Sequence, residues 1–172
     1  MNYGIAIFPS KRIQDAANSY RKRYDPRYAL IPPHITLKSP FTCSENDKES
    51  LIAELKHVAN NMSPFKISIQ KCRSFAPVNH TIYFKIEPNE EIQSLYREIH
   101  DSKFPTNEPH PFVPHITIAQ QLTTDEYADV FGQLKMTTLA YEDYVDRFHL
   151  LYQLDNGSWT VYQSFVFGKE QL

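Results

Sequence analysis

The chain has 172 residues, of which 41% are hydrophobic and 22% charged, a composition that fits one soluble globular domain. Its formal net charge of −2 argues against a protein that binds long polyanions through its overall field. No apolar run reaches the about 18 residues typical of a transmembrane helix, so we expect no membrane-spanning segment.

The N-terminal stretch and the cysteines bear on the compartment. Residues 1–8, followed by Pro9, lack the basic start and long apolar core of a secretory signal. The two cysteines, Cys43 and Cys72, have neither metal-type nor redox-type spacing. We therefore expect a cytoplasmic protein with reduced thiols.

Glycine is scarce, with four residues scattered along the chain: Gly4, Gly132, Gly157 and Gly168. No two of them are close enough to form a phosphate-cradling loop or a dinucleotide-binding fingerprint. Any phosphate must therefore be bound by side chains.

Hydrophobic periodicity predicts a regular alternation of strands and helices in the first part of the chain. Pro9 closes the first strand, and Ser44 with Asp47 resembles a capping box at the start of the second helix. The expected elements are a strand over 3–8, a helix over 10–24, a strand over 33–37, a helix over 44–61 and a strand over 65–75.

The same order then begins again. Pro88 closes a strand as Pro9 does, and Thr123 with Glu126 resembles a second capping box. The expected elements are a strand over 81–86, a helix over 90–104, a strand over 114–118, a helix over 123–134 and two long strands over 141–153 and 158–167, joined by a turn at 155–157.

One short motif occurs in both parts. Pro33-His34-Ile35-Thr36-Leu37 is repeated as Pro114-His115-Ile116-Thr117-Ile118, an offset of 81 residues (115 − 34). Successive side chains of a strand point to opposite faces, so each histidine shares a face with the threonine two residues later. The isoleucine and leucine neighbours should pack on the core.

Two motifs inside matching frames of secondary structure indicate an internal duplication. We expect a single domain over 1–172, with halves of about 1–79 and 80–172. The fold class is α+β: a bilobal, pseudo-twofold arrangement of two antiparallel β-sheets flanked by helices around a central cleft. The pseudo-twofold would bring the two His–Thr faces toward each other.

Two imidazoles across a cleft suit general acid–base catalysis on a phosphodiester, because a pKa of ~6.5 lets one ring be neutral and the other protonated near pH 7. His34 and His115 are the candidate acid and base, in either order. Thr36 and Thr117 are the candidate donors to the phosphate oxygens. No metal or other cofactor is expected, since the histidines and hydroxyls form a poor ligand set. A single His-x-Thr in a strand is more often structural, and it is the duplication that favours a shared site.

Three further residues are candidate substrate contacts. Lys38 shares the His34 face by parity, and Arg147 lies in a late strand. Tyr83, like Trp159, lies on a predicted strand where an aromatic ring is usually core but can stack on a base. For Lys38 and Arg147 the alternative is an exposed charge.

His34-Ile35-Thr36-Leu37 and His115-Ile116-Thr117-Ile118 resemble the paired motifs of the 2H phosphoesterase superfamily. Length and motifs are similar to a small bacterial branch of YjcG type, which includes RNA ligase-like proteins. The resemblance implies a bilobal fold, acid–base roles for His34 and His115, phosphate binding by Thr36 and Thr117, and no cofactor. Its substrates would be 2′,3′-cyclic or 2′,5′-linked phosphates of nucleotides or RNA ends.

Two function classes therefore compete. The first is a metal-independent phosphoesterase whose partner is a small nucleotide or an RNA-end phosphate. The second is a nucleotide or RNA-end binding protein with little or no turnover. Extended nucleic-acid binding is not expected, because several relatives carry a basic residue just after the second motif where this chain has Ala119-Gln120-Gln121. The sequence indicates no oligomeric state.

Overall fold

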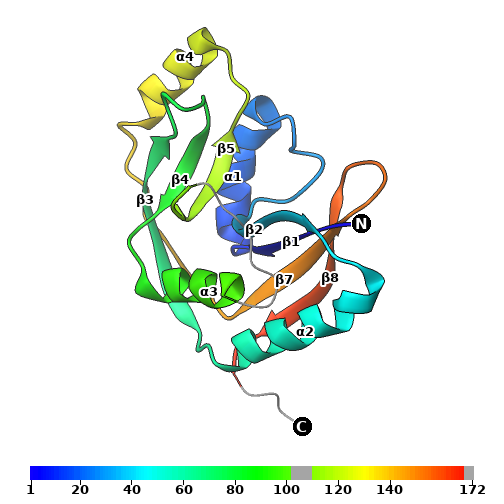
Figure 1. Ribbon diagram of the computed structural model, residues 1–172. Helices are drawn as coiled ribbons and strands as arrows, with labels where there is room; N and C mark the ends of the chain where they lie inside the picture. Colours follow the sequence, from blue (N-terminus) through cyan, green and yellow to red (C-terminus); the bar gives the residue numbers. More distant parts are fainter. Residues whose placement is uncertain (102–109, 169–172) are drawn as a thin grey trace.

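The fold, taken from a computed structural model that describes residues 1–101 and 110–168, is α+β. Two four-stranded antiparallel sheets and four helices make up the described part (Figure 1). The helices are α1 (Lys11–Tyr24), α2 (Glu45–Asn60), α3 (Glu90–His100) and α4 (Thr124–Leu134). The strands are β1 (Asn2–Ile7), β2 (Ile35–Thr42), β3 (Phe65–Ser74), β4 (Ile82–Ile86), β5 (His115–Ala119), β6 (Tyr141–Val145), β7 (Arg147–Gln153) and β8 (Trp159–Val166).

The two sheets repeat one topology. Their strand orders are β2-β1-β7-β8 and β5-β4-β3-β6, and every pairing is antiparallel. In each sheet the motif strand lies at one edge, beside the first strand of the same repeat. β2 is thus beside β1, and β5 is beside β4. The third position is filled by a strand from the other half of the chain, β7 in one sheet and β3 in the other. The predicted bilobal pseudo-twofold is confirmed, and the two lobes exchange strands.

The long strand predicted over 141–153 is wrong, because two strands occupy this stretch. β6 pairs with β3, whereas β7 pairs with β1 in the other sheet. Asp146 lies between them and its carbonyl accepts from Phe167 N–H at 2.8 Å. Two successive exposed charges, Asp146 and Arg147, interrupt the alternation, and the buried positions change parity between Val145 and Phe148. The prediction of one strand passed over this break, which periodicity can reveal although it does not say which sheet each strand joins.

The helix starts agree with their predicted caps. Ser44 accepts from the Asp47 amide at 3.3 Å, and Thr123 and Glu126 form the full reciprocal capping box. Helix α3 ends at His100 with Asp101 as its C-cap. The predicted extension to residue 104 lies outside the described residues.

The helices link the two lobes. α1 precedes β2 in the chain but packs against β5, and α3 precedes β5 but packs against β2. Figure 1 shows α1 beside β5, and Tyr20 of α1 meets Phe84 edge-on with ring centroids 6.3 Å apart. Because each motif strand is covered by the helix of the other repeat, the two motifs are held in one rigid core. Among the described residues, no helix is long and apolar enough to cross a membrane.

Candidate active site

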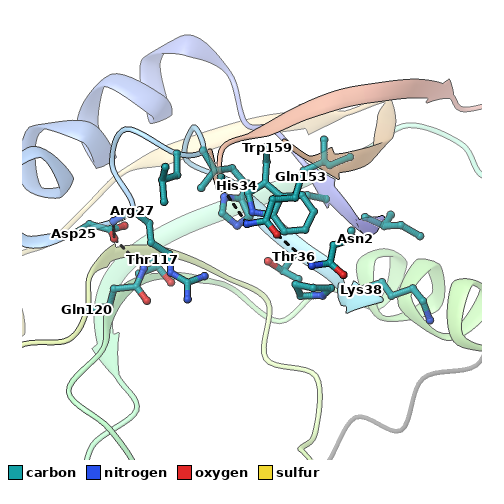
Figure 2. A pocket seen from close by; sticks show the side chains of 18 of the residues that line it. Asn2, Asp25, Arg27, His34, Thr36, Lys38, Thr117, Gln120, Gln153 and Trp159 are labelled. Carbon is teal, nitrogen blue, oxygen red and sulfur yellow. Dashed lines mark hydrogen bonds between the residues drawn. The ribbon is translucent and has the colours of Figure 1, made fainter. Parts of the chain in front are cut away.

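The two motif strands contact each other and open onto one cavity. β2 and β5 are in contact although they belong to different sheets. The apolar members of both motifs are buried, as the alternation predicted. A cavity of about 560 Å³ lies on the opposite face of β2 and includes four predicted site residues from both repeats: His34, Thr36, Lys38 and Thr117. Its other lining residues include Asn2, Gly4, Arg21, Asp25, Arg27, Gln120, Gln153 and Trp159 (Figure 2).

The β2 side presents a histidine in a fixed tautomer. His34 Nδ1 lies 2.8 Å from the Pro32 carbonyl oxygen, which can only accept a hydrogen bond. In the neutral ring this places the proton on Nδ1 and leaves Nε2 as an acceptor. Lys38, two residues beyond Thr36, also lines the cavity and is only 3% exposed. Its ammonium lies 4.9 Å from the Phe41 ring centroid.

The β5 side repeats this arrangement. His115 Nδ1 lies 2.6 Å from the Val113 carbonyl oxygen, so its neutral ring also has an accepting Nε2. Thr117 lines the cavity, whereas His115 is not among the residues that line it. Aromatic rings surround His115 instead: Phe75 meets it edge-on at 5.0 Å and Tyr83 lies at 5.1 Å.

Burial favours the neutral form of both histidines. It lowers the pKa of His34 to about 4, and although the Pro32 carbonyl opposes the shift, the Arg21 charge adds to it. Burial also lowers the pKa of His115 below its usual 6.5, against the opposing hydrogen bond to Val113. Both rings are therefore proton acceptors at neutral pH when the cavity holds no anion.

A buried ion pair at one end of the cavity was not predicted from the sequence. Arg21 Nε and Asp25 Oδ2 are 3.1 Å apart, and both side chains are 2% exposed. Arg21 also donates to the Ile31 carbonyl at 2.7 Å, and Asp25 Oδ1 accepts from Gln120 Nε2 at 2.9 Å. These contacts fix the loop before His34 to the residue just after β5. Arg21 falls on the apolar stripe of α1, four residues after Ala17. A charged residue on the buried face of a helix was the feature of the sequence from which a buried ion pair could have been predicted.

The remaining predicted contacts lie elsewhere. Arg147 is not among the cavity-lining residues, and its guanidinium binds Asp146 at 2.9 Å. Tyr83 also lies outside the lining, but it pairs with Thr117 across β4 and β5. Among the described residues, no group of three or more His, Cys, Asp or Glu side chains is placed to hold a metal ion.

Comparison with known proteins places the chain in a family. Residues 9–157 match the model of the 2′-5′ RNA ligase superfamily, to which the 2H phosphoesterases belong. The chain belongs to this superfamily. A protein of Oceanobacillus iheyensis, named as a candidate phosphoesterase, is 57% identical over 99% of this chain and 100% of its own length. A Bacillus pumilus protein with the same kind of name is 52% identical over 99% of each chain.

Solved structures share the fold at low sequence identity. Escherichia coli LigT, crystallised with 3′-AMP, has a TM-score of 0.70 and 14% identity, with 98% of each chain covered. A protein of Thermus thermophilus has a TM-score of 0.73 and 18% identity, covering 99% of this chain and 100% of its own. At these identities the likeness concerns the fold. The predicted resemblance to 2H phosphoesterases is confirmed.

Proposed function

We propose that this member of the 2′-5′ RNA ligase superfamily is a metal-independent phosphoesterase that hydrolyses 2′,3′-cyclic or 2′,5′-linked phosphodiesters of nucleotides or RNA ends. One observation carries the proposal. The two motif strands are in contact, each histidine has the same Nδ1–carbonyl hydrogen bond, and Thr36 and Thr117 line one cavity.

The reaction needs one proton removed and one delivered. In the hydrolysis of a cyclic phosphate, the Nε2 of one neutral histidine takes a proton from water as the water oxygen bonds to phosphorus. The bond from phosphorus to one ribose oxygen breaks, and the second histidine, protonated, gives that oxygen its proton. Thr36 and Thr117 donate hydrogen bonds to the non-bridging oxygens, where negative charge gathers in the transition state.

The negative charge of the substrate favours the protonated histidine that acts as the acid. Both histidines have lowered pKa values in the protein without substrate, so neither readily holds a proton at pH 7. A bound phosphodiester anion favours an imidazolium beside it and raises the pKa of the nearer ring. Protonation of one histidine is thereby coupled to substrate binding.

The test is hydrolysis of nucleoside 2′,3′-cyclic phosphates in EDTA by the wild type, His34→Ala and His115→Ala. We expect wild-type turnover that falls at least about 100-fold in each variant, since a general acid or base contributes about 10²- to 10⁴-fold. Unchanged thermal unfolding of the variants is the control for folding. Near-normal rates in either variant contradict the paired-histidine mechanism, and activity abolished by EDTA contradicts metal independence.

Binding without turnover by the wild type would support the other candidate, a nucleotide or RNA-end binding protein. Calorimetric titration with a nucleoside 2′,3′-cyclic phosphate, followed by analysis of the recovered nucleotide after long incubation, separates these two cases.

A further inference from the structure

The cavity is larger and more varied than a phosphate requires. Its volume of about 560 Å³ falls in the range of sites that hold whole small molecules, about 300–1,000 Å³. In Figure 2 the labelled side chains divide into two groups about His34. One group contains Asp25, Arg27, Thr117 and Gln120, and the other contains Asn2, Thr36, Lys38, Gln153 and Trp159.

Trp159 lines the cavity and packs against β1. Its backbone N–H donates to the Leu30 carbonyl at 2.8 Å, which ties the start of β8 to the loop that leads to His34. Its ring lies over Gly4 of β1, where an added Cβ would stand 3.6 Å from the indole Cζ3. The glycine therefore lets the indole lie close to the β1 backbone, and the residue remains half-buried rather than enclosed in the core.

Two side-chain amides lie beside the indole. Gln153 pairs with Trp159 across β7 and β8, and its Nε2 donates to the Gly157 carbonyl at 3.0 Å. Asn2 Nδ2 donates to Gln153 Oε1 at 3.3 Å. A side-chain amide has two donor hydrogens and an accepting oxygen, so Asn2 keeps hydrogen-bonding capacity beyond this bond. An aromatic plane edged by amides matches the chemistry of a nucleobase, which has a stacking face and a polar rim.

We propose that Trp159 forms the stacking platform of a nucleobase subsite, with Asn2 and Gln153 beside the base edge. The subsite takes its substrate class from the proposed function: the phosphate lies at the histidines and threonines, and the base of the same nucleotide lies on the indole. Trp159 is then a specificity residue that binds the nucleoside and takes no part in the proton transfers.

Trp159 is the one tryptophan of the chain, so its fluorescence reports on this subsite directly. We expect adenosine 3′-monophosphate to quench the emission saturably, because a stacked base contacts the indole. Ribose 5-phosphate, which has a phosphate and no base, should leave the emission unchanged at the same concentrations. Nucleotide binding by calorimetry without quenching, or no saturable binding up to millimolar nucleotide, overturns the proposal.

Substitution separates the subsite from the chemistry. Trp159→Leu should raise KM for adenosine 2′,3′-cyclic phosphate about tenfold or more, the size of effect seen when a stacking aromatic is removed. KM for glycerol 1,2-cyclic phosphate, which has no base, should not change. Trp159→Phe, which keeps an aromatic ring, should restore most of the affinity for the nucleotide. The matched control is Tyr162→Leu in the same strand, since Tyr162 contacts Tyr3 and Tyr152 instead of the cavity.

The outcomes distinguish the two proposals. Quenching by nucleotide without any hydrolysis leaves the subsite standing and contradicts the phosphoesterase. Hydrolysis with equal KM values for Trp159→Leu and wild type on the nucleotide leaves the phosphoesterase standing and contradicts the subsite.

Discussion

The two motif strands share a backbone arrangement and differ in what surrounds them. β2 and β5 are both edge strands, and each histidine is held through Nδ1 by the carbonyl two residues before it. His34, however, is near a buried ion pair and lines the cavity, whereas His115 is packed among Phe75 and Tyr83.

This difference separates what the duplication supplies from what each half has added. The repeated part is a strand, a tautomer and a hydroxyl, which is what a symmetric acid–base pair needs. The part that is not repeated positions the two lobes and contributes to the choice of substrate. The Arg21–Asp25 pair and Gln120 fix one lobe to the other, and Trp159 gives the cavity an aromatic side at one end only. Substitutions that treat the two sides differently test this division.

The largest effect is expected at the ion pair beside His34. Asp25→Ala leaves the buried Arg21 guanidinium without its carboxylate, and breaking such a pair costs about 3–5 kcal/mol. Urea unfolding should show this loss in the free energy of unfolding. The matched control is Asp15→Ala on α1, the helix that carries Arg21, since the partner of Asp15, Lys11, is at the surface. That exposed pair should cost at most about 1 kcal/mol. Equal losses in the two variants would contradict a special role for the buried pair.

The threonines test the repeated part. Thr36→Val and Thr117→Val remove a hydroxyl each at nearly constant volume, and each should lower kcat about 10²- to 10³-fold with intact folding, as loss of an oxyanion donor does. Thr42→Val, in the same strand as Thr36 but outside the cavity lining, is the control. A large loss from only one threonine would show that the two motifs do not share the phosphate equally.

The pH dependence tests the charge on the pair. Both free histidines have pKa values below 6.5, and kcat/KM reports the free enzyme, so its optimum should lie below pH 6.5. The bound phosphodiester raises the pKa of the acid, so the optimum of kcat should lie roughly one pH unit higher. Initial rates over a series of buffers measure both profiles. Coincident optima above pH 8 would exclude histidines of lowered pKa.

Local patterns predicted the elements well because most of the determining contacts are local. Alternation placed Ile35 and Ile116 in the core and predicted both motif strands, and capping chemistry located the starts of α2 and α4. The exchange of β3 and β7 between the sheets was not predicted. Strand partners are set by tertiary packing. The consecutive charges Asp146 and Arg147 break the alternation, but nothing local says which sheet each of the two strands joins.

The candidate site divides in the same way. The sequence singled out His34, Thr36 and Thr117, which line one cavity, because a repeated motif is visible without a structure. It missed Arg21, Asp25 and Gln120, whose contacts join residues up to 95 positions apart. Arg147 was chosen for its charge alone, and its neighbour Asp146 binds it.

The smallest effect is expected in the stability of the apo protein at acid pH. Burial holds the folded-state pKa of His34 near 4, below the about 6.5 of an unfolded chain. The unfolded state therefore binds more protons between these values, and stability falls as the pH drops from 6.5 toward 4. His34→Gln removes this titration, so the variant should lose less stability than the wild type between pH 8 and pH 5. The difference should be about 1 kcal/mol, since the half-exposed ring keeps part of its hydration. Urea unfolding at the two pH values measures it, with His57→Gln on the exposed side of α2 as the control. Equal losses of stability in the wild type and His34→Gln would show that His34 protonates as readily in the folded protein as in the unfolded chain. The proposed coupling of substrate binding to protonation of that ring would then be contradicted.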